Sequence, residues 1–143
     1  MFAPDRQTTV DAPLALFAIG DAVLLNQVFD NLISNAAKFG EKGGLIEMAL
    51  GARAGQAVFT IANTGRPIPQ QDHAKVCDRF YRADKSRSRE IEGSGLGLSL
   101  AREIARAHGG DLILERSAEQ TTAFAFTLPL ANPERQGACG ASQ

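Results

Sequence analysis

Hydrophobic residues recur with a helical period through residues 21–39, and this long stretch organises the chain. At about 100° per residue they fall on one broad face, as in a helix that covers a core. The face comprises Leu24, Leu25, Val28, Phe29, Leu32, Ile33, Ala36 and Phe39. Asp21 is a suitable N-cap, and Gly40 is a suitable stop signal. The pattern predicts one amphipathic helix that begins at Asp21 and stops at Gly40.

Shorter apolar runs bounded by turn residues predict two β-hairpins. The first hairpin joins residues 45–52 to 57–62, and the second joins residues 111–116 to 123–130. Two β-prone runs, at residues 8–10 and 14–19, come before the long helix. We therefore expect a sheet that is mainly antiparallel.

Two further helical segments lie between the hairpins. Residues 70–78 form the shorter one, and the longer one opens in a glycine-rich turn at residues 93–98 and runs to Ala107. Its expected core contacts are Leu96, Leu100, Ile104 and Ala105, and His108-Gly109-Gly110 follows as its cap. This element order predicts an α+β fold with a mixed sheet covered by helices on one face. Strict βαβ alternation is absent, which argues against a doubly wound parallel sheet.

Two segments lack any core pattern. Residues 82–94 carry a dense run of charges, so we expect a mobile arm there. Residues 132–143 have no periodicity, so we expect a disordered tail. The predicted organisation is one folded domain over residues 1–131, followed by that tail.

Composition and charge limit the classes of function. The 143 residues are 44% hydrophobic, and 15 basic residues nearly balance 16 acidic ones. With a net charge of −1, any anion site must be local, and no nucleic acid partner is expected. Cys77 and Cys139 have neither metal-ligand spacing nor the density of a disulfide scaffold, which favours a cytoplasmic location. We expect no membrane segment, because no apolar run is long enough.

A narrow polar stripe follows one edge of the long helix. Asn31, Asn35 and Lys38 are spaced i, i+4 and i+7, and Asn is a poor residue for a helix interior. Amide oxygens suit Mg²⁺, and the ammonium of Lys38 would add a point charge for phosphate. A solvated flank explains the same stripe, so both interpretations stay open.

The glycine-rich turn is a second candidate site. Gly93, Gly95 and Gly97 precede a helix, where backbone amides can approach an anion at the positive end of the helix dipole. The spacing is not that of a dinucleotide fingerprint, and a hinge for the charged arm accounts for it equally well. Arginines at positions 79, 82, 87 and 89 offer forked donors, or form a solvated face.

Residues 63–69 form a loop with a possible base contact. Asn63 could offer its amide to a purine edge, with Gly65 allowing close approach, or it could be a turn residue. We expect His73 to be exposed and Cys77 to be a small packing residue. No Ser-His-Asp, HExxH or zinc spacing occurs. Stripe and turn together suit a nucleoside triphosphate with a bound metal.

Taken in order, these motifs resemble those of the ATP-binding catalytic domain of sensor histidine kinases, within the wider group that includes gyrase, Hsp90 and MutL. Residues 30–39 resemble the asparagine box, 63–68 the first glycine box, 78–87 the phenylalanine box and 93–98 the second glycine box. The resemblance covers roughly residues 20–130. The run Phe-Tyr-Arg-x-Asp-Lys-Ser-Arg-Ser-Arg favours the kinase branch.

The resemblance implies a two-layer α/β sandwich of the Bergerat type, with ATP and Mg²⁺ beneath a lid of residues 82–94. Asn35 would bind Mg²⁺ and act in catalysis with Lys38, which would reach the terminal phosphates, while Asn31 would contact phosphate or metal. The implied nucleotide site comprises Asn31, Asn35, Lys38, Asn63, Gly65, Ile68, Tyr81, Arg82, Gly93, Gly95, Leu96, Gly97 and Leu98.

The resemblance also implies partners. The γ-phosphoryl would pass to a histidine on a separate dimerisation domain of the parent protein, and from there to a response regulator. Two departures from the family pattern stand out: Asn63 replaces an aspartate, and Pro67 replaces a glycine. We expect adenine selectivity to persist with reduced affinity. The alternatives are an anti-sigma-type serine kinase domain and a nucleotide- or partner-binding module without phosphoryl transfer.

Overall fold

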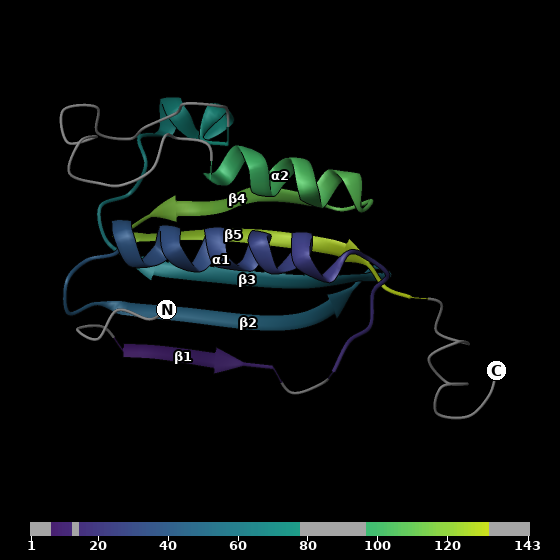
Figure 1. Ribbon diagram of the computed structural model, residues 1–143. Coiled ribbons are helices and arrows are strands. Elements are labelled where there is room, and N and C mark those ends of the chain that lie inside the picture. Colours follow the sequence, from purple (N-terminus) through teal and green to yellow (C-terminus); the bar gives the residue numbers. More distant parts are fainter. Residues whose placement is uncertain (1–6, 13–14, 78–96, 132–143) are drawn as a thin grey trace.

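The computed structural model describes residues 7–12, 15–77 and 97–131, and within them the chain folds into a sheet with helices on one side (Figure 1). The five strands have the spatial order β1-β2-β3-β5-β4. In chain order the elements are β1 (Gln7–Asp11), α1 (Ala22–Phe39), β2 (Leu45–Arg53), β3 (Gln56–Thr64), the 3₁₀ helix η1 (Gln70–Lys75), α2 (Gly97–Ala107), β4 (Asp111–Ala118) and β5 (Thr121–Pro129).

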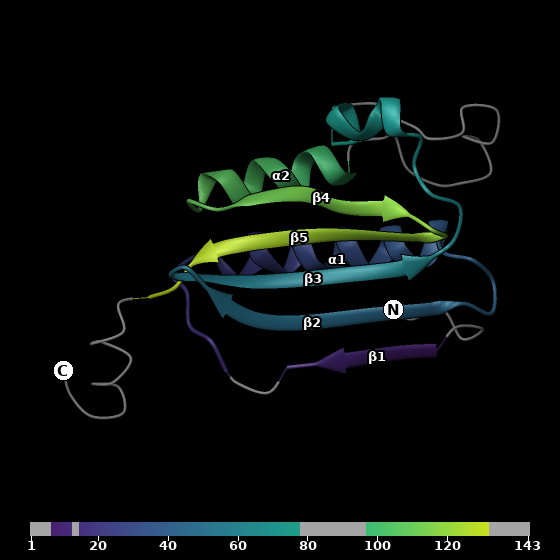
Figure 2. The same ribbon diagram turned by 180° about the vertical axis from the view of Figure 1, so that it is seen from behind.

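The sheet is mixed and mainly antiparallel, as predicted. β1 runs parallel to β2, whereas β2 with β3, β3 with β5, and β4 with β5 are antiparallel pairs. Both predicted hairpins are present. In the described part of the chain, the second face of the sheet is free of helices, as the view from behind shows (Figure 2). The predicted fold class, an α+β sandwich with helices on one face, is confirmed.

Local capping signals define α1 as the sequence predicts. The Asp21 carboxylate accepts hydrogen bonds from the Val23 and Leu24 backbone N–H groups, at 2.9 and 3.1 Å. At the other end, the Gly40 N–H donates to the Ala36 carbonyl at 2.9 Å. Because these bonds satisfy backbone groups that the helix leaves unpaired, the helix starts and stops at these residues.

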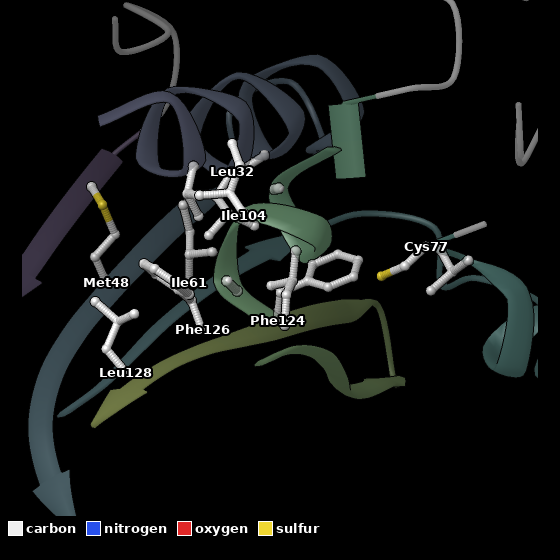
Figure 3. Packing of buried hydrophobic residues seen from close by; sticks show 14 of the residues in the cluster. Leu32, Met48, Ile61, Cys77, Ile104, Phe124, Phe126 and Leu128 are labelled. Carbon is white, nitrogen blue, oxygen red and sulfur yellow. The ribbon is translucent and has the colours of Figure 1, made fainter. Parts of the chain in front are cut away.

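The core lies between α1, α2 and the sheet (Figure 3). Phe29 of α1 meets Phe59 and Phe126 edge to face, with ring centroids 5.0 and 5.5 Å apart. The largest fully buried side chains are Phe126, Leu32, Ile46, Leu112 and Val28. Each such burial contributes about 1.5–3 kcal/mol. Cys77 is buried in the same cluster, so the prediction that it is a packing residue is confirmed.

The prediction assigned too many residues to the core face of α1, at both ends of the helix. Leu24 is 39% exposed and Phe39 is 44% exposed, whereas Val28, Leu32 and Ala36 are buried. Both exposed residues lie in a terminal turn, where the neighbouring elements no longer enclose the helix.

The predicted strand at residues 14–19 is wrong. From Ala15 to Ile19 the chain is irregular, and Phe17 and Ile19 are 57% and 74% exposed. The Phe17 carbonyl accepts a hydrogen bond from the Ala131 N–H at 2.8 Å. This stretch connects β1 to α1, and no neighbouring strand pairs with it, so its β-prone composition is not realised.

Two helical predictions need correction. Residues 70–78 yield a 3₁₀ helix that ends at Lys75. In α2 the buried residues are Ser99, Ala101, Ile104 and Ala105, whereas Leu100 is 37% exposed. Leu100 lies at the edge of the stripe formed by the other residues, so Ala101 takes its expected place. Leu96, the predicted arm at 82–94 and the predicted tail at 132–143 lie outside the described residues.

No helix in the described ranges is long and apolar enough to cross a membrane.

Candidate functional site

The polar stripe of α1 lies beside the first residue of α2. The Asn31 Nδ2 donates a hydrogen bond to the Gly97 carbonyl, at 3.1 Å. Asn31 and Asn35 are half-buried, and Lys38 is exposed. This bond excludes a purely solvated flank for Asn31. It also brings together the asparagine stripe and the glycine turn, which are more than 60 residues apart in the sequence.

Asn35 differs from its neighbour in having no fixed partner. It is half-buried one turn after Asn31, and within the described part of the chain its carboxamide makes no hydrogen bond. Solvent still reaches the Asn35 amide, so a ligand can take the place of water there. Asn35 is therefore the residue of the stripe best suited to meet a ligand.

The first turn of α2 supplies positive potential at this point. The leading N–H groups of a helix have no acceptor within the helix and form the positive end of its dipole. A Cβ placed on Gly97 would meet no atom of the described residues within 4 Å, so these residues leave room for a ligand beside Gly97. Leu98 packs against the core, which anchors the turn. The arrangement suits an anionic ligand.

The end of β3 forms a second wall close to the end of α1. The Glu41 N–H donates to the Thr64 carbonyl at 2.6 Å, which joins the segment after α1 to β3. Gly65 has φ of 154°, and a Cβ there would lie 3.0 Å from the Phe39 carbonyl oxygen. Only glycine adopts this conformation at such close approach without strain. Gly65 thus allows β3 to approach the end of α1 closely, and its expected role beside a purine stays a prediction.

Asn63 lies within β3, and its side chain is buried with only 7% exposure. Its Nδ2 donates to the Thr64 carbonyl at 3.3 Å. The strand thus extends past the loop start that the sequence suggested, and Asn63 faces the helix side of the sheet together with Ile61 and Phe59. With its NH₂ group directed at Thr64, the side chain leaves its oxygen as an acceptor.

Two buried hydroxyl groups beside Asn63 were not found by sequence reasoning. Thr122 of β5 is opposite Asn63, and Ser117 of β4 is opposite Thr122. Their hydroxyl oxygens are 2.7 Å apart, and the Ser117 oxygen accepts from the Ile68 N–H at 2.7 Å. These bonds hold Ile68 at Ser117, on the second strand over from Asn63. No local signal identifies the pair, because it depends on strand register.

His73 also differs from its prediction. We expected an exposed side chain, but it is half-buried, and its Nε2 lies 3.0 Å from the Ile68 carbonyl oxygen. The His73 ring therefore connects η1 to the segment that follows β3. This contact explains why the side chain is half-buried.

The structure gathers much of the predicted site at one end of the molecule, where α1 ends and α2 begins (Figure 1). The predicted site residues in this region are Asn31, Asn35, Lys38, Asn63, Gly65, Ile68, Gly97 and Leu98. The others, Tyr81, Arg82, Gly93, Gly95 and Leu96, lie outside the described residues.

The donor set limits how a metal could bind. Within residues 7–12, 15–77 and 97–131, no group of three or more His, Cys, Asp or Glu side chains could hold a metal ion. The amide oxygens of Asn31 and Asn35 are hard donors that fit Mg²⁺, which keeps several waters and usually shares phosphate oxygens. A metal carried with a polyphosphate fits this site better than a resident metal.

An α/β sandwich with an amide-lined helix edge, a positive helix end and the buried polar residues Asn63, Ser117 and Thr122 is an arrangement suited to a nucleotide. Residues 20–132 match the family described as "Histidine kinase-, DNA gyrase B-, and HSP90-like ATPase". The sensor histidine kinase WalK of Bacillus subtilis is 38% identical over 128 residues, which cover 88% of this chain and 20% of WalK.

Solved structures agree with the sequence matches. A mycobacterial sensor histidine kinase, MprB, superposes with a TM-score of 0.73 at 30% identity, covering 88% of this chain and 83% of that chain. The structure of full-length ShkA in complex with AMPPNP superposes with a TM-score of 0.74 at 26% identity. The match covers 89% of this chain and 26% of the ShkA chain. The chain therefore belongs to this ATPase family, and within it is the catalytic ATP-binding domain of a two-component sensor histidine kinase.

Proposed function

We propose that this domain binds ATP together with Mg²⁺ and donates the γ-phosphoryl to a histidine on a separate dimerisation domain. The hydrogen bond between Asn31 and Gly97 is the observation that carries the proposal, because it places an amide-lined helix against the positive end of another helix. The structure of full-length ShkA in complex with AMPPNP supports nucleotide binding by this family.

In this proposal Asn35 binds the metal. Its half-buried amide is without a protein partner in the described part of the chain, and an amide oxygen is a ligand that Mg²⁺ accepts. Asn31 lies one turn away and contacts phosphate or metal with its oxygen, because its nitrogen is already used by Gly97. Lys38 brings the point charge of its ammonium group to the terminal phosphates.

The base binds at the other wall, on the helix-facing side of β3 and β5. Asn63 accepts a hydrogen bond from the adenine amino group, since its NH₂ group already donates to Thr64. The Thr122 hydroxyl lies opposite in the sheet and extends the same polar surface. An amide oxygen lacks the charge of the aspartate that the family pattern has here, so the bond is weaker.

The acceptor histidine comes from outside this chain. Phosphoryl transfer depends mainly on positioning and charge stabilisation, so an intact donor site does nothing until its acceptor is presented. The chain spans about a fifth of the length of WalK, which leaves ample length for such a domain in a relative. We propose that a response regulator then takes the phosphoryl group from that histidine, in the cytoplasm.

The test mixes the domain with Mg²⁺, ATP labelled in the γ-phosphoryl and the parent's dimerisation domain. We expect acid-labile, base-stable label on that domain. Label on serine, stable to acid, would favour a serine kinase instead. Nucleotide binding without any transfer would favour a binding module, and absence of nucleotide binding would contradict the proposal at its first step.

A further inference from the structure

Two glycine-containing motifs meet at the end of the helices away from the proposed nucleotide site. Gly20-Asp21 precedes α1, and His108-Gly109-Gly110 follows α2. The Asp21 backbone N–H donates to the His108 Nε2 at 3.1 Å. The His108 Nδ1 lies 2.9 Å from the Ile104 carbonyl oxygen. The imidazole therefore bridges the start of α1 and the end of α2. These two helix ends lie at the same end of the molecule (Figure 1).

The hydrogen bonds define the state of the ring. Because Nε2 accepts from an N–H group, it carries no hydrogen, so the hydrogen of the neutral ring is on Nδ1 and is donated to Ile104. A protonated ring would direct a second donor at the Asp21 N–H. The bridge thus requires one tautomer of a neutral imidazole.

The glycines leave space for the ring and for the turn after it. A Cβ on Gly20 would lie 2.6 Å from the His108 Cδ2 and 2.7 Å from a Leu25 methyl carbon. Gly109 has φ of 87°, which ends α2, and a Cβ on Gly110 would collide with the Thr127 carbonyl. The small glycines at positions 20, 109 and 110 thus allow the segment before α1 and the segment after α2 to pack closely.

The bridge lies at the far end of an antiparallel pair of helices. The Asn31 contact is with the first residue of α2, and the Asp21 contact is with the residue just after its last turn. α2 has 11 residues, so it is about 16 Å long. A swing of about 4° around its far end would move Gly97 by about 1 Å. Such a shift is enough to break a hydrogen bond of 3.1 Å.

We propose that His108 is a positioning residue for nucleotide binding. Its neutral imidazole fixes the end of α2 to the start of α1, and so holds Gly97 opposite Asn31 at the nucleotide site. This inference rests on the proposed function, because it assumes that the Asn31 end is where ATP binds.

The test compares His108→Gln with His108→Leu, two side chains of similar volume. Gln can accept the Asp21 hydrogen bond with its amide oxygen, whereas Leu cannot. Calorimetry with Mg²⁺ and ATP should show affinity within about twofold of wild type for His108→Gln and about three- to tenfold weaker for His108→Leu. Equal affinities for the two variants would overturn the inference.

Gly20→Ala is an independent test that leaves His108 in place. Its methyl carbon would lie 2.6 Å from the His108 Cδ2 and displace the ring, so we expect the affinity to fall as for His108→Leu. Val58→Ala, on the helix-free face, is the control for lost stability and should bind ATP as wild type does. If Gly20→Ala, measured well below its unfolding midpoint, binds as tightly as Val58→Ala, the inference fails. If wild type itself does not bind ATP, the proposed function fails instead.

Discussion

The two ends of the α1 and α2 pair contrast in how their polar groups are satisfied. At the far end, both ring nitrogens of His108 have protein partners. The Asp21 carboxylate there accepts from the Val23 and Leu24 N–H groups. At the nucleotide end, Asn31 uses one amide hydrogen, and Asn35 makes no hydrogen bond within the described part of the chain. The closed end holds the helices together, and the open end leaves binding capacity for a ligand.

This contrast shows that one end of the helix pair contributes to stability and the other end to ligand binding. An amide that only solvent satisfies adds no contact to the folded state, but it can exchange that water for a ligand. A saturated end offers nothing to a ligand, but it can limit how the helices move. Substitutions at the two ends should therefore affect different measurements.

The largest effect is expected in the core that joins both ends. Leu32→Ala removes a fully buried side chain of α1, which should lower the free energy of unfolding by about 2–5 kcal/mol. Urea unfolding followed by circular dichroism measures it. Val23→Ala, at a position 76% exposed on the same helix, is the control and should change little. Similar losses for both would show that α1 is not held by this core.

At the open end, Asn35→Ala should lower the affinity for ATP in the presence of Mg²⁺ by roughly 100-fold, as expected for a lost metal contact. The free energy of unfolding should hold or rise, because a side chain without a protein partner is removed. Calorimetry with and without Mg²⁺ measures the effect, and Ser34→Ala, exposed next to it in α1, is the control. Unchanged Mg²⁺ dependence in Asn35→Ala would disprove the metal role.

Asn63→Asp sharpens the comparison at the base-binding wall. A carboxylate accepts a stronger hydrogen bond from the adenine amino group, so we expect ATP affinity to rise by about three- to tenfold. The unliganded domain should lose stability, because the charge is buried and the donor to Thr64 is lost. Calorimetry with ATP, and with GTP as control, tests this. A fall in ATP affinity would contradict the assignment of Asn63.

The smallest effect concerns Asp111, just after the closed end. Burial raises the pKa of this carboxyl, but the Leu112 N–H and the guanidinium groups of Arg106 and Arg102 outweigh it and lower the pKa below its ordinary value of 3.8. A lowered pKa in the folded state stabilises the fold above pH 3.8, and the contribution disappears as the pH falls through the folded-state pKa.

The effect should be about 0.5 kcal/mol or less, because the carboxylate is 39% exposed and solvent screens it. Urea unfolding of wild type and Asp111→Asn at neutral and acidic pH measures it. Wild type should be the more stable protein at pH 7 and should lose that advantage below pH 3.8. A difference that does not change with pH would remove the electrostatic explanation.

Local signals in the sequence were enough for most elements. Asp21 and Gly40 mark the start and the end of α1, because capping depends on residues within one turn. The hairpins follow from turn residues between runs of alternating hydrophobic and polar residues. The strand expected at residues 14–19 failed because a strand needs a neighbour to pair with, and composition does not provide one. The prediction that Leu100 is a core contact was wrong, because the position of α2 on the sheet decides which of its residues are buried.

The site divides in the same way. The sequence alone determined the types of chemical group available: two amides and an ammonium on one helix edge, glycines before another helix, and an amide near a strand end. Only the tertiary structure decided which of them meet, such as Asn31 with Gly97, Thr122 with Ser117, and His108 with Asp21. Helical period and capping act over a few residues, whereas register and helix packing depend on the whole core.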